Sequence, residues 1–357
     1  RSFYPAFLTL FAKSILPSHI NLDPEEMPAW AYNRQPDPVL GPFVLQEWAL
    51  EDHLTAVRNV EYEGWASRGQ PYLDAVTLRW IGSTEEGIEL LQAGEIDLVW
   101  DVAEADLFGA ETWSGIGVVR QMSTATERLI LNLRNPNLRA PCADALAKKP
   151  GWHWALGDPR VREAIEVAID KQRLLAATLP MYGSPVTAEL NQGPYVTRVP
   201  PSEYNLEWAG TLLDEAGWKD RNDDGVRECH GCLYAQAGRP LQLEIATTAG
   251  HELRERTALM LATMLKKIGI ELTVVRVPAS TLFGSFERGA FRSYGQFDIL
   301  MYASGFGIEP YSRLNGSFAS GSIPCDKNSG QGTNYSRWID EEADAALAAA
   351  GSSPDPH

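Results

Sequence analysis

The sequence predicts an α/β fold in which helices flank mixed or largely parallel β-sheets. Two observations support this prediction. Segments with strand-like and helix-like patterns alternate along the chain, and the helical segments between strands are long enough to form crossover connections. The chain has 357 residues, which is enough for roughly two domains of about 150 residues each. Its apolar content of 44% and charged content of 22% are ordinary for a folded globular protein.

The most regular alternation lies in residues 241–303. Its pattern predicts strands at 241–248, 270–277 and 297–303, with helices at 252–269 and 280–289 between them. The first of these helices has an apolar stripe, so we expect one side of it to be buried. The stripe consists of Leu253, Thr257, Met260, Leu261, Met264 and Leu265.

Helix signals also occur earlier in the chain. Residues 157–179 predict one long helix, because Asp158 suits the N-cap and Pro159 suits the first helical position. Residues 204–218 predict another helix, which Asn205 caps and a glycine ends. Nearer the N-terminus we expect strands at 75–81 and 95–102, with a helix at 84–94 between them.

The charge balance limits the classes of partner. The net charge of −16 argues against a nucleic-acid backbone or an anionic membrane surface, because both bind basic patches. The longest apolar run, at 258–265, is far shorter than the about 20 residues that a bilayer-spanning helix needs. The chain begins at Arg1 rather than Met, so we expect a fragment or a processed chain. The lack of a visible signal peptide therefore does not indicate a compartment.

The sequence contains no familiar catalytic motif. G-x-S-x-G, the Walker phosphate loop and H-E-x-x-H are all missing. The segment HELRE, at 251–255, ends in Glu where zinc binding needs a second His, and it predicts an exposed helix start. In SGFGIEP, at 304–310, Gly305 and Gly307 lack the third Gly of a dinucleotide site. This segment predicts an exposed strand end, which a ligand can approach.

The stretch DRNDDGVRECHGC, at 220–232, has oxygen-bearing side chains at alternate positions. Asp220, Asn222 and Asp224 have the spacing of the first three ligands of a calcium loop. However, the twelfth position is Gly231 instead of the bidentate Glu. We therefore predict a solvated turn, with an open calcium site as the alternative.

The four cysteines of the chain are Cys142, Cys229, Cys232 and Cys325, and the sequence alone allows three pairings. A redox pair at Cys229 and Cys232 would need a helix N-terminus to lower the thiol pKa, whereas this pair lies in a loop before a strand. We expect either a small structural disulfide between them or two separate pairings. Either arrangement implies an oxidising compartment.

Five ordered segments resemble the family 5 extracellular solute-binding proteins, the oligopeptide and dipeptide receptors of ABC importers. The similarity runs from about Phe7 to Ala349. Its segments are GPFVLQEW at 41–48, RNVEYEGWASRGQPYLDAVTLRWI at 58–81, DPRVREAIEVAIDKQRL at 158–174, YNLEWAGTLLDEAGWKDRNDDGVRE at 204–228 and GTNYSRWIDEEADAAL at 332–347.

The resemblance implies a two-lobed fold of the type II periplasmic-binding-protein class, cluster C, incomplete at both ends. Residues 1–133 would form part of the first, hinge-proximal lobe, and residues 134–357 most of the second lobe, truncated at its C-terminus. In the family the acidic turn connects a helix to a hairpin. The isolated chain would bind ligand less tightly than the full-length protein, because missing segments leave a sheet edge exposed.

The implied function is capture of a peptide outside the cytoplasmic membrane and delivery to ABC permease subunits. We expect a monomer with no cofactor and no enzymatic activity, in the periplasm or at the cell surface, lipid-anchored when full-length. The alternatives are a receptor for a non-peptide solute such as an oligosaccharide, a sensing domain for signalling, and an enzyme with chemistry between its lobes.

The resemblance also suggests where the ligand binds. An Asp that pairs with the peptide ammonium in the family corresponds to Phe306, and Glu309 is the nearest carboxylate. The Arg that holds the peptide carboxylate in dipeptide receptors is missing, and Arg254 is the first Arg after that loop. An extended peptide would instead pair with a strand edge at 302–305. The expected ligand-binding residues are Tyr302, Ala303, Ser304, Gly305, Phe306, Glu309, Tyr311, His251 and Arg254.

Overall fold

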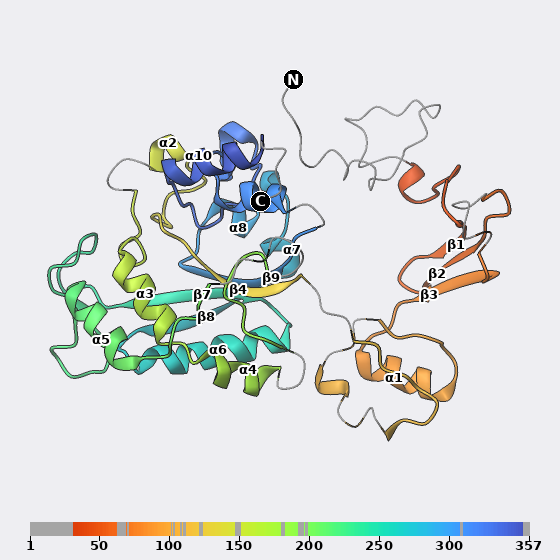
Figure 1. Cartoon of the computed structure of the whole chain (residues 1–357), viewed down its shortest axis with the longest axis horizontal. Coiled ribbons are helices and arrows are strands. Elements are labelled where there is room, and N and C mark those ends of the chain that lie inside the picture. The colour runs from red at the N-terminus through yellow and green to blue at the C-terminus, as the bar shows by residue number, and fades with distance from the viewer. Residues whose placement is uncertain are drawn as a thin grey trace. The chain divides into compact units, whose positions relative to one another are not determined.

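The computed structural model of the chain is shown in Figure 1. It describes residues 31–352 with the exception of 63–68, 70, 101, 103, 108, 110–111, 121–123, 147–150, 180–182, 192–195, 197–198 and 308–309. The chain divides into two compact units between Val119 and Arg120. No helix in the described part is long and apolar enough to cross a bilayer.

The smaller unit contains an antiparallel sheet of three strands in the order β1-β2-β3. The strands are β1 (Phe43–Ala49), β2 (His53–Arg58) and β3 (Ala75–Arg79), and they are followed by helix α1 (Thr84–Ala93). Ser83 caps the start of α1 by accepting a hydrogen bond from the backbone N–H of Glu86, and Gly94 ends it in the left-handed conformation. Short 3-10 turns lie at Ala31–Asn33 and Glu104–Leu107.

The larger unit is built on a mixed sheet of four strands in the order β4-β9-β7-β8. The strands are β4 (Thr126–Leu131), β7 (Gln242–Thr248), β8 (Glu271–Val277) and β9 (Ile299–Ser304). β7 runs parallel to both β8 and β9, whereas β4 is antiparallel to β9. Two short strands, β5 (Trp218–Lys219) and β6 (Glu228–Cys229), form a separate hairpin.

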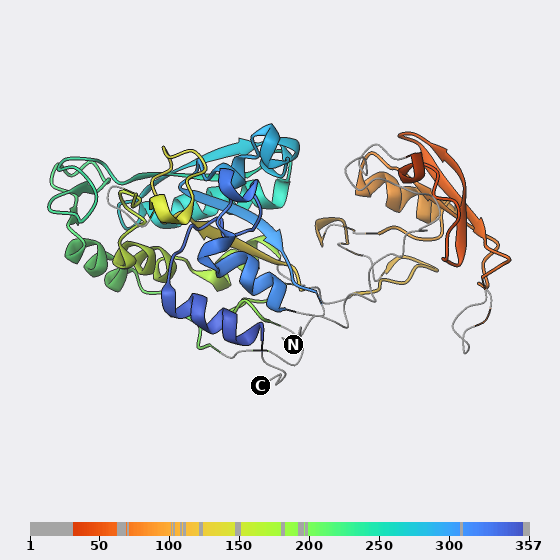
Figure 2. The ribbon, with the colours of Figure 1, turned by 90° about the horizontal axis from the view of Figure 1, so that it is seen from above.

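Helices cover both faces of the large sheet (Figure 1). On one face lie α3 (Pro159–Val167), α4 (Lys171–Thr178), α5 (Leu206–Glu215) and α6 (Glu252–Lys266). The other face is covered by α7 (Ala279–Leu282), α8 (Phe291–Tyr294) and more C-terminal segments. Figure 2 looks down on that side, where the blue C-terminal helices overlie the strands. The remaining helices are α2 (Ala143–Leu146), α9 (Tyr311–Phe318) and α10 (Glu341–Ala350), and 3-10 turns lie at Phe286–Arg288, Ser320–Ser322 and Asp326–Asn328.

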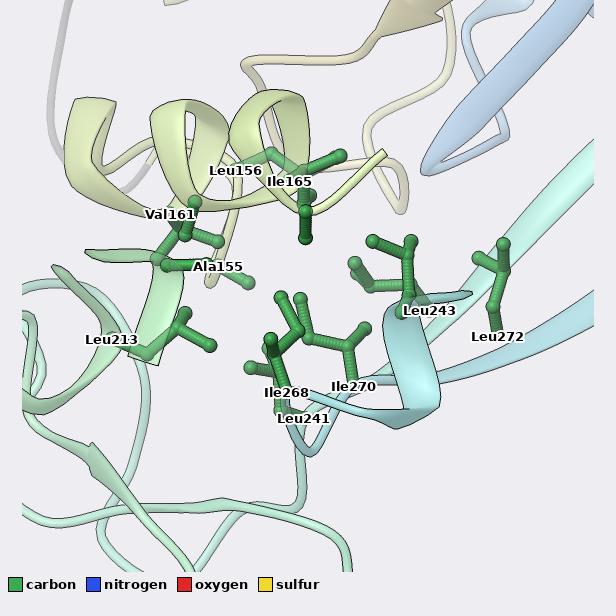
Figure 3. Packing of buried hydrophobic residues seen from close by; sticks show 14 of the residues in the cluster. Ala155, Leu156, Val161, Ile165, Leu213, Leu241, Leu243, Ile268, Ile270 and Leu272 are labelled. Atoms are coloured by element: carbon green, nitrogen blue, oxygen red, sulfur yellow. The ribbon is translucent and has the colours of Figure 1, made fainter. Parts of the chain in front are cut away.

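The main hydrophobic core fills the space between the sheet and helices α3, α5 and α6. Val161 and Ile165 point from α3 toward residues at the base of the strands, such as Leu243 and Ile270 (Figure 3). All four side chains are at most 2% exposed. A smaller cluster on the opposite face contains Ala246, Val277, Leu282, Phe297, Leu300, Tyr302 and Tyr335. The inner strand β9 is therefore buried on both faces, which explains its nearly continuous apolar sequence, ILMYAS.

Three predicted elements differ from the observed ones. The helix expected at 157–179 is two helices, because the chain leaves the helical path at 168–170 and Asp170 caps α4. The helix expected at 280–289 is the short α7 followed by a 3-10 turn, with Gly284 between them. The strand expected at 95–102 forms no strand in its described residues, and Leu98 and Trp100 there are 72% and 83% exposed.

The boundary between the units also lies earlier than the one expected after Leu133. Strand β4 pairs with β9 along its whole length, so it belongs to the larger unit. A boundary at Leu133 would separate β4 from the sheet that satisfies its backbone hydrogen bonds.

Two disulfides link distant and local parts of the larger unit. Cys142, before α2, is bonded to Cys325, which lies 183 residues later in the chain. Cys229 is bonded to Cys232 beside the β5–β6 hairpin. The first bond connects the segment after β4 to the C-terminal segments, so two parts of the chain far apart in sequence are held together.

A buried histidine connects the segment before α3 to the sheet. His153 is fully buried; its Nδ1 accepts hydrogen bonds from the backbone N–H groups of Ala155 and Leu156, and its Nε2 lies 2.9 Å from a carboxylate oxygen of Asp298. The other oxygen of Asp298 accepts from the N–H of Glu244 in β7. Because Nδ1 accepts two hydrogen bonds, the ring proton lies on Nε2 and the imidazole is neutral. Burial lowers the pKa of His153, and this outweighs the opposing effect of Asp298.

This arrangement predicts that stability falls as the pH drops below the ordinary histidine value of 6.5. A lowered pKa in the folded state means that the stabilisation is complete above that value and is lost at lower pH, by up to about 1.4 kcal/mol per pH unit. Urea unfolding of the wild type and of His153→Asn between pH 7 and pH 5 measures the effect. We expect the variant to be less stable at pH 7 but to lose stability less steeply. Equal slopes would show that His153 does not cause the loss.

Candidate functional site

The candidate site lies at one end of the large sheet, where β7 and β9 finish and the antiparallel β4 begins. Ser304, the last residue of β9, pairs with Thr126, the first residue of β4. Loops that leave the carboxyl ends of parallel strands are common ligand sites, because they bring backbone and polar side chains together at one edge. Thr247 and Thr248 end β7 at the same edge of the sheet.

Two arginines share one glutamate on the face of the sheet that contacts α7 and α8. Both Glu189 carboxylate oxygens accept hydrogen bonds of 2.6 Å from Nη1 of Arg128, and one accepts a 2.9 Å bond from Nε of Arg313. Arg128 also donates to the carbonyl oxygen of Ser304, and Arg313 donates to the Ser304 hydroxyl. This ion cluster therefore connects β4, β9, α9 and the segment after α4.

The cluster changes the acidity of its carboxylate. Burial alone would raise the pKa of Glu189, but the hydrogen bonds and charges of Arg128 and Arg313 lower it overall. A lowered carboxylate pKa means that the cluster stabilises the fold fully above the ordinary value of 4.5 and loses that effect as the pH falls further. Glu189 is thus ionised at neutral pH.

A second ion pair lies on the opposite face, between α6 and β4. Arg254, in the first turn of α6, donates a 2.7 Å hydrogen bond to Glu127 and a 2.9 Å bond to the Thr248 hydroxyl. His251 occupies the N-cap position of α6 without making a side-chain capping bond. His251 and Arg254, which the sequence suggested as ligand contacts, therefore lie near the end of β7. Arg254 also contacts the start of β4.

Several polar atoms around this end of the sheet are buried without a hydrogen-bond partner. Among the described residues they are Oδ1 of Asn191, Nδ1 of His251 and Nε of Arg292. Asn191 donates to the Thr126 hydroxyl at the start of β4, and Arg292 lies within 5.9 Å of the Tyr302 ring of β9. Buried polar atoms are nearly always hydrogen-bonded in folded proteins, so each such atom needs an explanation. A bound ligand would provide the missing partners.

The expected strand edge at residues 302–305 is occupied on one side. β9 is an inner strand; it pairs with β4 as far as Ser304 on one side and with β7 through Ile299 and Leu300 on the other. The sequence could not reveal this, because β4 follows no strand–helix repeat that would place it beside β9. On the β4 side a peptide can add to the backbone only beyond Ser304, whereas the side toward β7 has no ladder pair beyond Leu300.

Beyond Ser304 the chain runs close to the start of β4. The Thr124 hydroxyl donates a 2.8 Å hydrogen bond to the carbonyl oxygen of Phe306. A Cβ atom on Gly305 would lie 2.6 Å from the Thr124 hydroxyl oxygen, whereas one on Gly307 would have nothing within 4 Å. Glycine at 305 therefore permits a close backbone approach. Glu309 lies outside the described residues.

The aromatic candidates differ in exposure. Tyr302 is only 5% exposed and forms an edge-to-face pair with Phe283, so its ring is part of the smaller core cluster. Phe306 and Tyr311 are both partly buried, as is the non-aromatic candidate Ala303. Tyr302 is thus poorly placed to stack on a flat ligand.

The acidic turn connects β5 to β6. Asp220 accepts from the N–H of Gly225, Asn222 from that of Asp224, and Asp224 from that of Val226, so the turn stabilises its own backbone. One carboxylate oxygen each of Asp220, Asp224 and Glu228 lies within 4.8 Å of the other two. Carboxylates suit a hard cation, and calcium binding here stays a prediction.

The family model for bacterial extracellular solute-binding proteins, family 5 Middle, matches residues 2–323. The chain belongs to this family. The oligopeptide-binding protein AppA of Bacillus subtilis is 28% identical over 281 residues, which cover 76% of this chain and 46% of AppA. The chain thus spans about half the length of such curated relatives.

Solved structures share the fold of this family 5 chain. AppA of Bacillus subtilis in complex with a nonapeptide gives a TM-score of 0.66 at 25% identity, covering 99% of this chain and 63% of AppA. NikZ of Campylobacter jejuni with Ni(L-His) gives 0.76 at 22% identity, covering 99% and 63%. A periplasmic oligopeptide-binding protein of Thermotoga maritima bound to mannohexaose gives 0.67 at 20% identity, with the same coverage. The mixed sheets flanked by helices are those of type II periplasmic binding proteins, which confirms the predicted fold class.

Sequence reasoning missed Arg128, Glu189, Asn191 and Arg313. One signal was present for Arg128, because a charged residue inside the apolar segment TERLIL needs a partner where a strand is buried on both faces. Glu189 lies in an irregular segment without periodicity, so its position beside β9 could not be predicted.

We expect Gly305→Ala to destabilise the larger unit by about 1–3 kcal/mol, because the added methyl group forces the start of β4 to move. Urea unfolding monitored by circular dichroism measures the change. Gly307→Ala is the matched control and should have almost no effect. Similar losses in both variants would contradict the close approach at Gly305.

Glu189→Gln should lower the free energy of unfolding by about 2 kcal/mol, because it leaves two partly buried guanidinium groups without a carboxylate. Lys327→Gln removes an exposed ion pair with Asp144 and should cost less than about 0.5 kcal/mol. Thermal or urea unfolding of both variants tests the difference. If Glu189→Gln matched the control, the ion cluster would not be a stabilising feature.

Proposed function

We propose that the full-length protein is an extracytoplasmic receptor of an ABC importer, which captures peptides and delivers them to permease subunits. One observation supports this proposal above the others: three buried polar atoms without partners surround the same end of the sheet, where Gly307 is also exposed. This arrangement suits a ligand that supplies hydrogen-bond donors and acceptors along an extended chain. Peptides have that chemistry at every residue.

The ligand-binding residues in this proposal are those at the strand ends. Ser304 to Phe306 would contact the peptide backbone, and His251 and Arg254 would contact it from the start of α6. Burial of Tyr302 argues against an aromatic platform for a sugar ring, so peptides are favoured over oligosaccharides. The relative AppA, whose structure contains a nonapeptide, supports the same choice.

Capture rather than bond cleavage is the working step in this proposal. Around the strand ends, the described residues include no nucleophile with a base and an orienting group beside it. The two disulfides support a location outside the cytoplasm, because such bonds persist in oxidising compartments. The protein would act as a monomer, lipid-anchored in its full-length form.

Native mass spectrometry of the full-length protein, purified from its own compartment, tests this proposal. We expect a series of added masses that correspond to peptides of several residues. After stripping and refolding, synthetic nonapeptides should rebind, and the chain 1–357 alone should bind them more weakly than the full-length protein. A single non-peptide mass would replace the ligand class, and no bound mass together with no rebinding would contradict the receptor function.

A further inference from the structure

The acidic turn between β5 and β6 brings three carboxylates together. One oxygen each of Asp220, Asp224 and Glu228 lies within 4.8 Å of the other two. Calcium–oxygen distances of about 2.3–2.6 Å place two ligands of one ion at most about 5 Å apart, so a single ion can contact all three. Counted from Asp220, the third carboxylate stands at the ninth position of the loop rather than at the twelfth, which is Gly231.

The carboxylate of Asp220 has one oxygen that is buried without a partner. Its Oδ2 accepts a 2.9 Å hydrogen bond from the backbone N–H of Gly225, which fixes the orientation of the group. Its Oδ1 exposes less than 1 Å² and has no hydrogen-bond partner among the described residues. A carboxylate oxygen that has lost water without gaining a donor is costly, and a cation would offset that cost. Asp220 and Gly225 also line a surface hollow of about 530 Å³, so an ion can reach the turn.

The protein supplies little positive charge to these three carboxylates. In the described part of the chain, no lysine or arginine forms an ion pair with them, and the basic contact is Nε2 of His230, 3.9 Å from Glu228. Four cationic side chains line the same hollow without pairing with the carboxylates: Lys219, Arg221, Lys266 and Lys267. Like charges at this separation repel one another, so the turn favours a bound cation.

The ends of the turn are fixed by the strands on either side of it. Lys219 of β5 pairs with Glu228 of β6, so the strand register keeps Asp220, the next residue, close to Glu228. Cys229, which follows Glu228, is bonded to Cys232. The carboxylates are therefore held together before an ion arrives, which reduces the entropy lost on binding.

We propose that Asp220, Asp224 and Glu228 bind one calcium ion, which stabilises the larger unit. Oxygen ligands from an irregular turn suit calcium, whereas magnesium demands a near-ideal octahedron. The loop lacks the bidentate Glu at its twelfth position, so the expected Kd is about 0.1–1 mM, the range of extracellular calcium modules. This site is independent of the proposed transport function.

Calorimetric titration of calcium chloride into the full-length protein, stripped with a chelator, tests the site. Asp220→Asn and Glu228→Gln should each weaken calcium binding by about tenfold or more, because each removes a charged ligand. Asp223→Asn is the matched control and should leave the Kd unchanged. Asp223 is exposed in the same turn but outside the cluster, and its φ of 59° is one that asparagine tolerates. Calcium at about 10 mM should also raise the Tm of the wild type by about 3–10 °C.

Each outcome decides the assignment. Loss of binding in Asp220→Asn and Glu228→Gln, with binding kept in Asp223→Asn, supports the site. Circular dichroism checks folding, and Glu228→Gln carries the comparison if Asp220→Asn does not fold. A wild type that binds no calcium, or a Glu228→Gln variant that binds it as tightly as the wild type, overturns the proposal. Equal losses in all three variants would trace binding to the overall charge of the turn, and equal stabilisation by magnesium would overturn the choice of calcium.

Discussion

The larger unit depends on the position of β9 between β4 and β7. As an inner strand, β9 contributes to both core clusters, because its alternate side chains point to opposite faces of the sheet. Its backbone pairs with β4 as far as Ser304, whereas its ladder with β7 consists of Ile299 and Leu300. The exposed Gly307 lies close to the end of this strand, so a ligand there would meet a pre-organised surface.

The same constraint explains the charged groups around the strand ends. Arg128 and Glu127 are neighbours in β4, so their side chains project to opposite faces of the sheet. Glu189 links Arg128 to Arg313 of α9. Glu127 accepts a hydrogen bond directly from Arg254 of α6. Ionic contacts on both faces thus fix the edge of the sheet where the polar atoms without partners lie.

The sequence was sufficient for local structure and insufficient for the pairing of distant strands. The 241–303 alternation correctly located β7, α6, β8 and β9, because periodicity and capping are local properties. The family 5 similarity supplied the fold class. Neither indicated that β4 would pair with β9 or that Glu189 would lie between two arginines. Those contacts depend on how segments far apart in the chain meet.

The bond between Cys142 and Cys325 has a practical consequence for handling the protein. It joins cysteines 183 positions apart, and the enclosed segment includes α2 to α9 and every strand of the large sheet except β4. A protease that cuts a surface loop inside this ring leaves the two pieces covalently joined. Nicked and intact molecules then co-migrate on a denaturing gel until a reductant is added. An apparently homogeneous sample must therefore be examined in its reduced form before its binding is interpreted.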